Sequence, residues 1–136
     1  MKWFTTYNNG SAIDLRQIPS MSYAEFFEAM RERLSNPACH VAHYFGVPVE
    51  ETRLRVWCLL LNDEEHTIEV ASFDVDYYDD ELPSLTKEFA AMHPFERDMT
   101  ERWGVRYDGM PWDKPLRAPS RSARRGGTID EYPFYK

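Results

Sequence analysis

The stretch that decides the fold is CHVAHYFGVPVEETRLRVWCLLLNDEEHTIEVASFDV, residues 39–75. It contains three runs rich in β-branched and aromatic residues, at 39–45, 52–61 and 67–75, and each run predicts a strand. The connections between the runs are short, which favours antiparallel hairpins over parallel crossovers. Apolar and polar residues alternate in the second run, so we expect the sheet to have one buried and one wetter face.

A helix is predicted immediately before these strands. Ser22 and Glu25 have the spacing of a capping box, and apolar residues follow at helical spacing until Pro37, which removes a backbone donor. Residues 3–7 predict a short strand further upstream. The order of strand, helix, three strands and then helices indicates an α+β fold, an antiparallel sheet of about four strands with helices on one face.

The segment after the strands predicts a loop and two helices. The acidic run at 74–81 is expected to be a loop. Ser84 is expected to cap a short helix at 84–92, and Pro94 to begin a second helix. Gly104 lies where a left-handed C-cap ends a helix.

Charge is distributed unevenly along the chain. The net charge is −7, but residues 1–113 hold 10 basic and 21 acidic side chains, whereas residues 114–136 hold 6 and 2. The excess of acid argues against a generic nucleic-acid binder. We therefore expect an α+β domain at 1–117 and a basic, extended tail at 118–136 that docks on a partner. The aromatic anchors of this tail would be Tyr132, Phe134 and Tyr135.

Cysteine content and hydropathy limit the class of protein. Cys39 and Cys58 are too few to build an iron-sulfur or zinc cluster from cysteines alone. Residues 1–10 lack a signal pattern, and the apolar run at 56–61 is too short to cross a bilayer. These features predict a cytoplasmic protein whose membrane contact goes through partners.

Two groups of residues are candidates for metal ligands. His40 and His43 are of a suitable type, but side chains three apart on a regular strand point to opposite faces. The acidic run at 74–81 could hold a hard cation, although a solvated loop or interaction patch fits it better. Motifs for phosphate binding or nucleophilic catalysis are missing from the sequence. We expect no catalytic, cofactor-binding or metal residue here, with a small metal-dependent enzyme as an alternative.

The predicted helix after Pro94 carries regularly spaced charges. Arg97 and Glu101 are four residues apart, as are Asp98 and Arg102, so each pair can interact along one helix face. Spacing alone does not distinguish these pairs from ordinary surface pairs.

The same region carries a family resemblance. The motif segments are PSLT at 83–86, HPFERD at 93–98, GVRYDGMP at 104–111 and LR at 116–117. They resemble the 30-kDa subunit family of respiratory complex I, the proton-translocating NADH:quinone oxidoreductase. They are also similar to its counterparts in membrane-bound, energy-converting nickel-iron hydrogenases. Asp98 stands where the family pattern has glutamate, Glu101 where it has aspartate, and Met110 where it has histidine. These departures indicate a divergent branch.

The resemblance implies a subunit that binds no redox cofactor. Such a subunit is peripheral to the inner membrane and docks beside the large subunit, which forms the quinone site or the nickel-iron site, and near iron-sulfur subunits. The shortness of the chain favours the hydrogenase branch. A free-standing adaptor that keeps the fold outside the complex is the alternative. The residues expected to bind partners are Glu96, Arg97, Asp98, Glu101, Gly104, Arg117, Tyr132, Phe134 and Tyr135.

Overall fold

The structure is a computed structural model that describes residues 3–7, 10, 12–111 and 114. It divides into two compact units, residues 1–75 and residues 76–136. The division falls inside the domain predicted at 1–117. The predicted α+β class is confirmed, because an antiparallel sheet and separate helices make up the described part.

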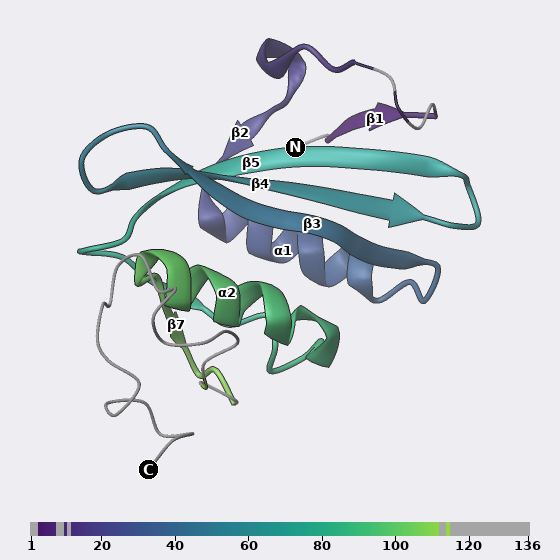
Figure 1. Cartoon of the computed structure of the whole chain (residues 1–136). Helices are drawn as coiled ribbons and strands as arrows, with labels where there is room; N and C mark the ends of the chain where they lie inside the picture. Colours follow the sequence, from purple (N-terminus) through teal and green to yellow (C-terminus); the bar gives the residue numbers. More distant parts are fainter. Residues whose placement is uncertain (1–2, 8–9, 11, 112–113, 115–136) are drawn as a thin grey trace. The chain divides into compact units, whose positions relative to one another are not determined.

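The first unit is built on a five-stranded sheet (Figure 1). Its main path runs β1-β5-β4-β3, and β2 also pairs with β5. The pairs β1–β5 and β3–β4 are antiparallel, as expected for the hairpin of residues 39–62, whereas β2 runs parallel to β5. The strands are β1 Phe4–Thr6, β2 Ser20–Met21, β3 Cys39–Pro48, β4 Arg53–Asn62 and β5 Thr67–Asp76.

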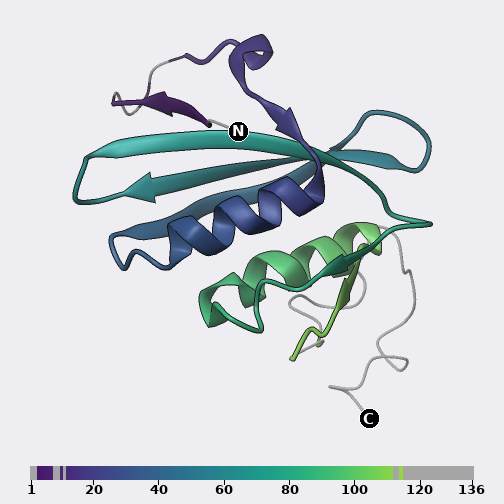
Figure 2. The same ribbon diagram turned by 180° about the vertical axis from the view of Figure 1, so that it is seen from behind.

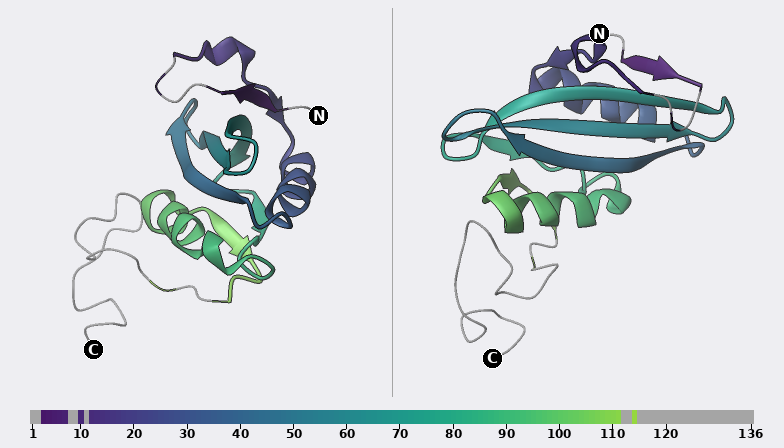
Figure 3. Two further views of the ribbon diagram at one scale, coloured as in Figure 1. Left: turned by 90° about the vertical axis from the view of Figure 1, so that its right-hand side faces the viewer. Right: turned by 45° about the horizontal axis from the view of Figure 1, so that its top comes forward.

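Helix α1, Tyr23–Leu34, lies across one face of this sheet (Figures 2 and 3). The predicted capping box is confirmed, because Ser22 Oγ accepts from the Glu25 amide at 3.2 Å while the Glu25 carboxylate accepts from the Ser22 amide. Phe26 and Met30 are fully buried. The centroid of the Phe26 ring lies 4.6 Å from that of the Phe73 ring on β5, so the helix and the sheet share an aromatic core.

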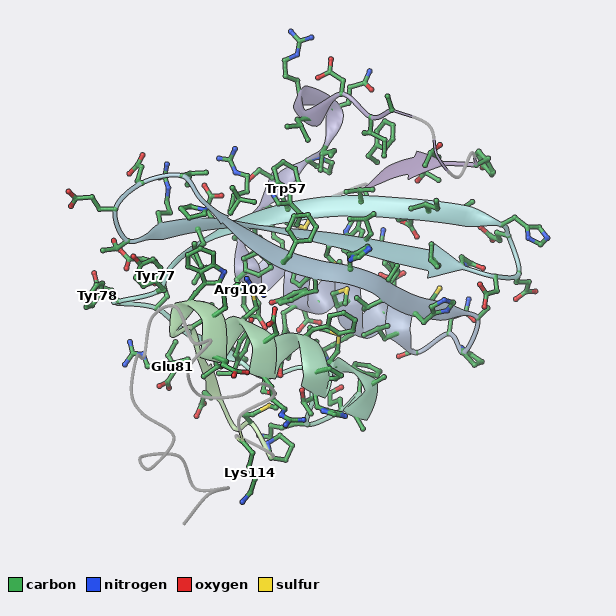
Figure 4. The ribbon with its side chains drawn as sticks, in the orientation of Figure 1. Trp57, Tyr77, Tyr78, Glu81, Arg102 and Lys114 are labelled. Carbon is green, nitrogen blue, oxygen red and sulfur yellow. The ribbon has the colours of Figure 1, made fainter. Side chains whose placement is uncertain are left out.

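The two faces of β4 differ as the alternation predicted. Val56, Cys58 and Leu60 are buried, and Leu54 before them is also buried. The side chains between them point the other way. In Figure 4 Trp57 lies on the viewer's side of the sheet, while α1 lies behind it. We call this side the open face of the sheet.

The second unit contains a helix and a small parallel sheet. Strand β6 pairs with β7, and Ser84 N extends the pairing by donating to Asp108 O at 2.9 Å. The 3-10 turn η2 leads directly into helix α2. These elements are β6 Glu81–Pro83, η2 Ala90–Met92, α2 His93–Trp103 and β7 Arg106–Asp108; the first unit also contains the 3-10 turn η1, Leu15–Gln17.

Two sequence predictions about this region are wrong. The helix expected at 84–92 is not formed, because residues 85–88 are a bend and a turn, and only η2 is helical. The acidic run at 74–81 is not one loop. Asp74 and Asp76 belong to β5 and Glu81 begins β6, so only the residues between Asp76 and Glu81 form the turn.

Candidate functional site

The charged motif predicted as a docking site lies on α2. Pro94 is in the first turn of this helix, where its missing amide hydrogen is not needed. Gly104 ends the helix with φ +79°, and its amide donates to Thr100 O at 2.9 Å. The predicted left-handed C-cap is thereby confirmed.

Glu96 is the most buried charged residue of the motif, with a fully inaccessible side chain. Its carboxylate accepts from Ser84 Oγ and Thr86 Oγ1, both at 2.6 Å. It also accepts from two backbone amides, Leu85 N at 2.8 Å and Thr86 N at 3.3 Å. We call this arrangement of Glu96 with residues 84–86 the Glu96 clamp.

The Glu96 clamp holds residues 84–86 against α2. The amides of Leu85 and Thr86 are taken by a carboxylate, and Thr86 N also lies 3.1 Å from Ser84 Oγ. Hydrogen bonds to an ionised acceptor are stronger than neutral ones, contributing about 1.5–3 kcal/mol each. The four hydrogen bonds of the clamp together tie residues 84–86 to α2. The Glu96 side chain is thus engaged inside the unit, and its predicted docking role stays a prediction.

Arg97 is also largely buried, with 7% of its surface exposed. Its Nε donates to Lys114 O at 2.9 Å, and its Nη1 lies 3.2 Å from His93 Nδ1, one helical turn earlier (Figure 4 labels Lys114). Arginine can make both contacts because its guanidinium offers several donors in a fixed plane. Arg97 therefore holds the backbone that follows β7 against the start of α2.

The other predicted charges differ in exposure. Asp98 Oδ1 lies 3.8 Å from Arg102 Nε, which confirms that predicted pair as a long contact. Glu101 is buried, with 6% of its surface exposed. The predicted pair of Arg97 and Glu101 stays a prediction.

Met110, which replaces the histidine of the family pattern, lies beside the Glu96 clamp. Its Sδ is 3.6 Å from Ser84 Oγ. The preceding Gly109 has φ +78°, and a Cβ added there would lie 2.7 Å from Lys87 Cδ. The substitution therefore lies next to the clamp, where a soft sulfur replaces a polar ring.

The predicted metal candidates are placed as follows. A β-bulge lies between Val41 and His43, so His40 is opposite Leu61 and His43 is opposite Leu59. Leu59 and Leu61 share a face, so the expectation that the two imidazoles diverge is wrong. Within the described ranges no group of three or more His, Cys, Asp or Glu side chains could hold a metal ion.

The carboxylates of the acidic run at 74–81 form hydrogen bonds at the end of β5 and in the turn that follows it. Asp74 accepts from Arg55 Nε at 2.9 Å, and this hydrogen bond raises the pKa of the Arg55 guanidinium. Asp76 Oδ1 accepts from the amides of Tyr78 and Asp79, and Asp80 Oδ2 accepts from Asp76 N. These carboxylates therefore take part in local hydrogen bonds that shape the turn.

Both cysteines are free thiols. Burial raises the pKa of the Cys58 thiol, and to a lesser degree that of Cys39. A thiol with a raised pKa is a weak nucleophile and a weak metal ligand at neutral pH. Both residues therefore behave as small apolar side chains.

Four predicted docking residues lie outside the described residues: Arg117, Tyr132, Phe134 and Tyr135. Sequence reasoning missed the roles of Ser84 and Thr86, although the PSLT segment that contains them was recognised as a motif.

Within the part of the chain that the structure describes, no helix is long and apolar enough to cross a membrane.

Comparison with known families gives one informative result. The model of the family described as respiratory-chain NADH dehydrogenase, 30 Kd subunit, matches residues 17–125. The matched span includes α1, the Glu96 clamp and Arg97. A comparison with individual curated proteins finds no significant match.

Proposed function

The chain belongs to the family of the 30 kDa subunit of respiratory-chain NADH dehydrogenase, and we propose that it acts as a scaffold in such an assembly. Members of this family are peripheral subunits of larger assemblies. In this proposal the chain carries no catalysis of its own. It positions the large subunit, which forms the quinone site or the nickel-iron site, on the cytoplasmic side of the inner membrane.

The observation that carries the proposal is the Glu96 clamp. A catalytic carboxylate needs an oxygen that can reach a substrate, whereas all four donors around Glu96 come from the chain itself. A buried carboxylate with satisfied oxygens suits a rigid shape rather than a reaction. The family motif therefore supports a structural role.

Arg97 supports the same proposal in a different way. It fixes the carbonyl of Lys114, just before the segment predicted to dock through Arg117 and the terminal aromatics. A fixed exit point lowers the entropy that a docking segment loses on binding. Asp98 and Gly104 lie on the same helix and at its end, so they belong to this proposed interface.

Met110 favours a second candidate function. It stands beside the Glu96 clamp where the family pattern has histidine. If that histidine contacts a neighbour in other members, its loss fits an adaptor that keeps the fold outside the redox complex. The co-purification experiment described next separates the two functions.

The test is purification of the tagged chain at native expression in mild detergent. We expect it to bring down a large redox subunit and iron-sulfur subunits, and the identity of that large subunit decides between the dehydrogenase and hydrogenase branches. Arg97→Ala should clearly reduce the yield of redox subunits but only slightly lower the melting temperature of the chain. The exposed control Arg31→Ala should change neither quantity. Recovery of no redox subunit with the unmodified chain would overturn the scaffold proposal and favour the adaptor.

A further inference from the structure

We propose that a groove on the open face of the first unit's sheet receives a partner segment with an apolar or aromatic side chain next to a Lys or Arg. The groove has a volume of about 760 Å³ and lies at the end of the sheet where β4 turns into β5. This inference rests on the proposed function, because it names the surface and the partner chemistry of a scaffold subunit.

The floor of the groove is apolar. Leu59 and Leu61 of β4 line it together with Ile68 of β5. Leu59 and Leu61 have the same parity as Trp57, whose side chain lies on the open face (Figure 4), and they alternate with Cys58 and Leu60, which are buried in the core. The three floor residues are only partly buried, so this surface is still open to a ligand.

The β-bulge of β3 shapes one side of the groove. Ala42 is the extra residue between the pairs Val41–Leu60 and His43–Leu59, and it also lines the groove. Bulges re-aim neighbouring side chains and increase local twist. Here the extra residue is small, so the bulge opens space beside Leu59 instead of filling it.

The rim is fixed by the turn between β4 and β5. Asn62 Oδ1 accepts from the amides of Glu64 and Glu65, both at 3.0 Å. Asp63 N donates to Ala38 O at 3.0 Å, and His66 adopts φ +56°, a left-handed conformation uncommon for a residue other than glycine. A rim held by these contacts is formed before a ligand arrives, which lowers the entropy lost on binding.

The charge of the rim selects the ligand. Asp63 lines the groove, and the adjacent Glu64 and Glu65 are exposed at the same turn. Residues 1–75 as a whole carry 11 acidic and 6 basic side chains. A cation placed beside the rim is therefore attracted, while an acidic segment is repelled. Tyr7, 76% exposed at the groove edge, offers an aromatic face to the same cation.

Photo-crosslinking identifies the occupant directly. A photoreactive phenylalanine analogue replaces Tyr7, and the control carries it at Tyr78, an equally exposed tyrosine in the second unit. After purification of the native complex, we expect the Tyr7 probe to capture a peptide of another subunit with an apolar side chain beside Lys or Arg. Capture of residues 115–136 of this chain, of a second copy, or of nothing in an intact complex would overturn the inference.

Two substitutions test the chemistry of the groove. Leu61→Glu should lower the yield of the partner at least tenfold, and Asp63→Lys should lower it severalfold with a loss that shrinks at high salt. The control Leu15→Glu changes an equally apolar, exposed residue outside the groove and should leave the yield unchanged. Asp63 is exposed, so its variant remains informative if Leu61→Glu fails to fold. Wild-type yields from folded variants would overturn the inference, whereas absence of redox subunits with the unmodified chain would instead overturn the proposed function.

Discussion

The core of the first unit contains packed aromatic rings, whereas the core of the second unit combines apolar side chains with one buried, hydrogen-bonded carboxylate. In the first unit the centroid of the Phe26 ring lies 5.7 Å from that of the Trp3 ring and 4.6 Å from that of the Phe73 ring. In the second unit Glu96 accepts from Ser84, Leu85 and Thr86. Apolar packing tolerates changes that conserve volume, whereas a buried polar group depends on every partner. The two units should therefore respond differently to similar substitutions.

The largest expected effect is in the aromatic core. Phe26→Ala removes a fully buried ring and leaves a cavity, so it should lower the free energy of unfolding by about 4 kcal/mol. Chemical denaturation followed by circular dichroism measures this loss. The matched control is the half-buried neighbour, Phe27→Ala, which should lose less than half as much. Equal losses would mean that the ring cluster around Phe26 is not the centre of the core.

The next effect concerns the Glu96 clamp. Glu96→Ala removes the acceptor of two hydroxyls and of the Leu85 amide, which should cost about 3 kcal/mol of unfolding free energy. Glu96→Gln keeps the volume but points an NH₂ group at donors, so it should fall between alanine and wild type. The exposed Glu88→Ala is the control and should stay within about 0.5 kcal/mol. Stability of Glu96→Ala close to that of wild type would show that the second unit is held by apolar packing instead.

The smallest effect concerns the end of α2. Gly104 has φ +79° and open space around an added Cβ, so Gly104→Ala introduces backbone strain without a clash. We expect a loss of about 1 kcal/mol in the same denaturation experiment. Gly104→Asn should lose less, because asparagine adopts this conformation more readily than alanine. Equal stability of all three chains would indicate that the helix end frays before the unit unfolds.

The sequence predicted those features that depend on neighbours along the chain. The capping box of Ser22, the alternation of β4 and the glycine at the end of α2 each follow from local spacing. The bulge at Ala42 has no such signal, because it depends on how two strands align. The same is true of the contact between Ser84 and Glu96, which joins residues 12 positions apart in the sequence. Glu96 and Asp98 are both acidic docking candidates on the same predicted helix. Only the structure shows that Glu96 is fully buried and Asp98 is partly exposed.

The pairing of β1 with β5 has a consequence for the order in which the protein is made. Phe4 pairs with Val70, so a translating ribosome must add 66 further residues before the partner exists. At about 5–20 residues per second this delay lasts roughly 3–13 seconds. Ser84 and Glu96, by contrast, are separated by a second or so of synthesis. The second unit can therefore close almost as soon as it emerges, while the earliest strand waits for its partner.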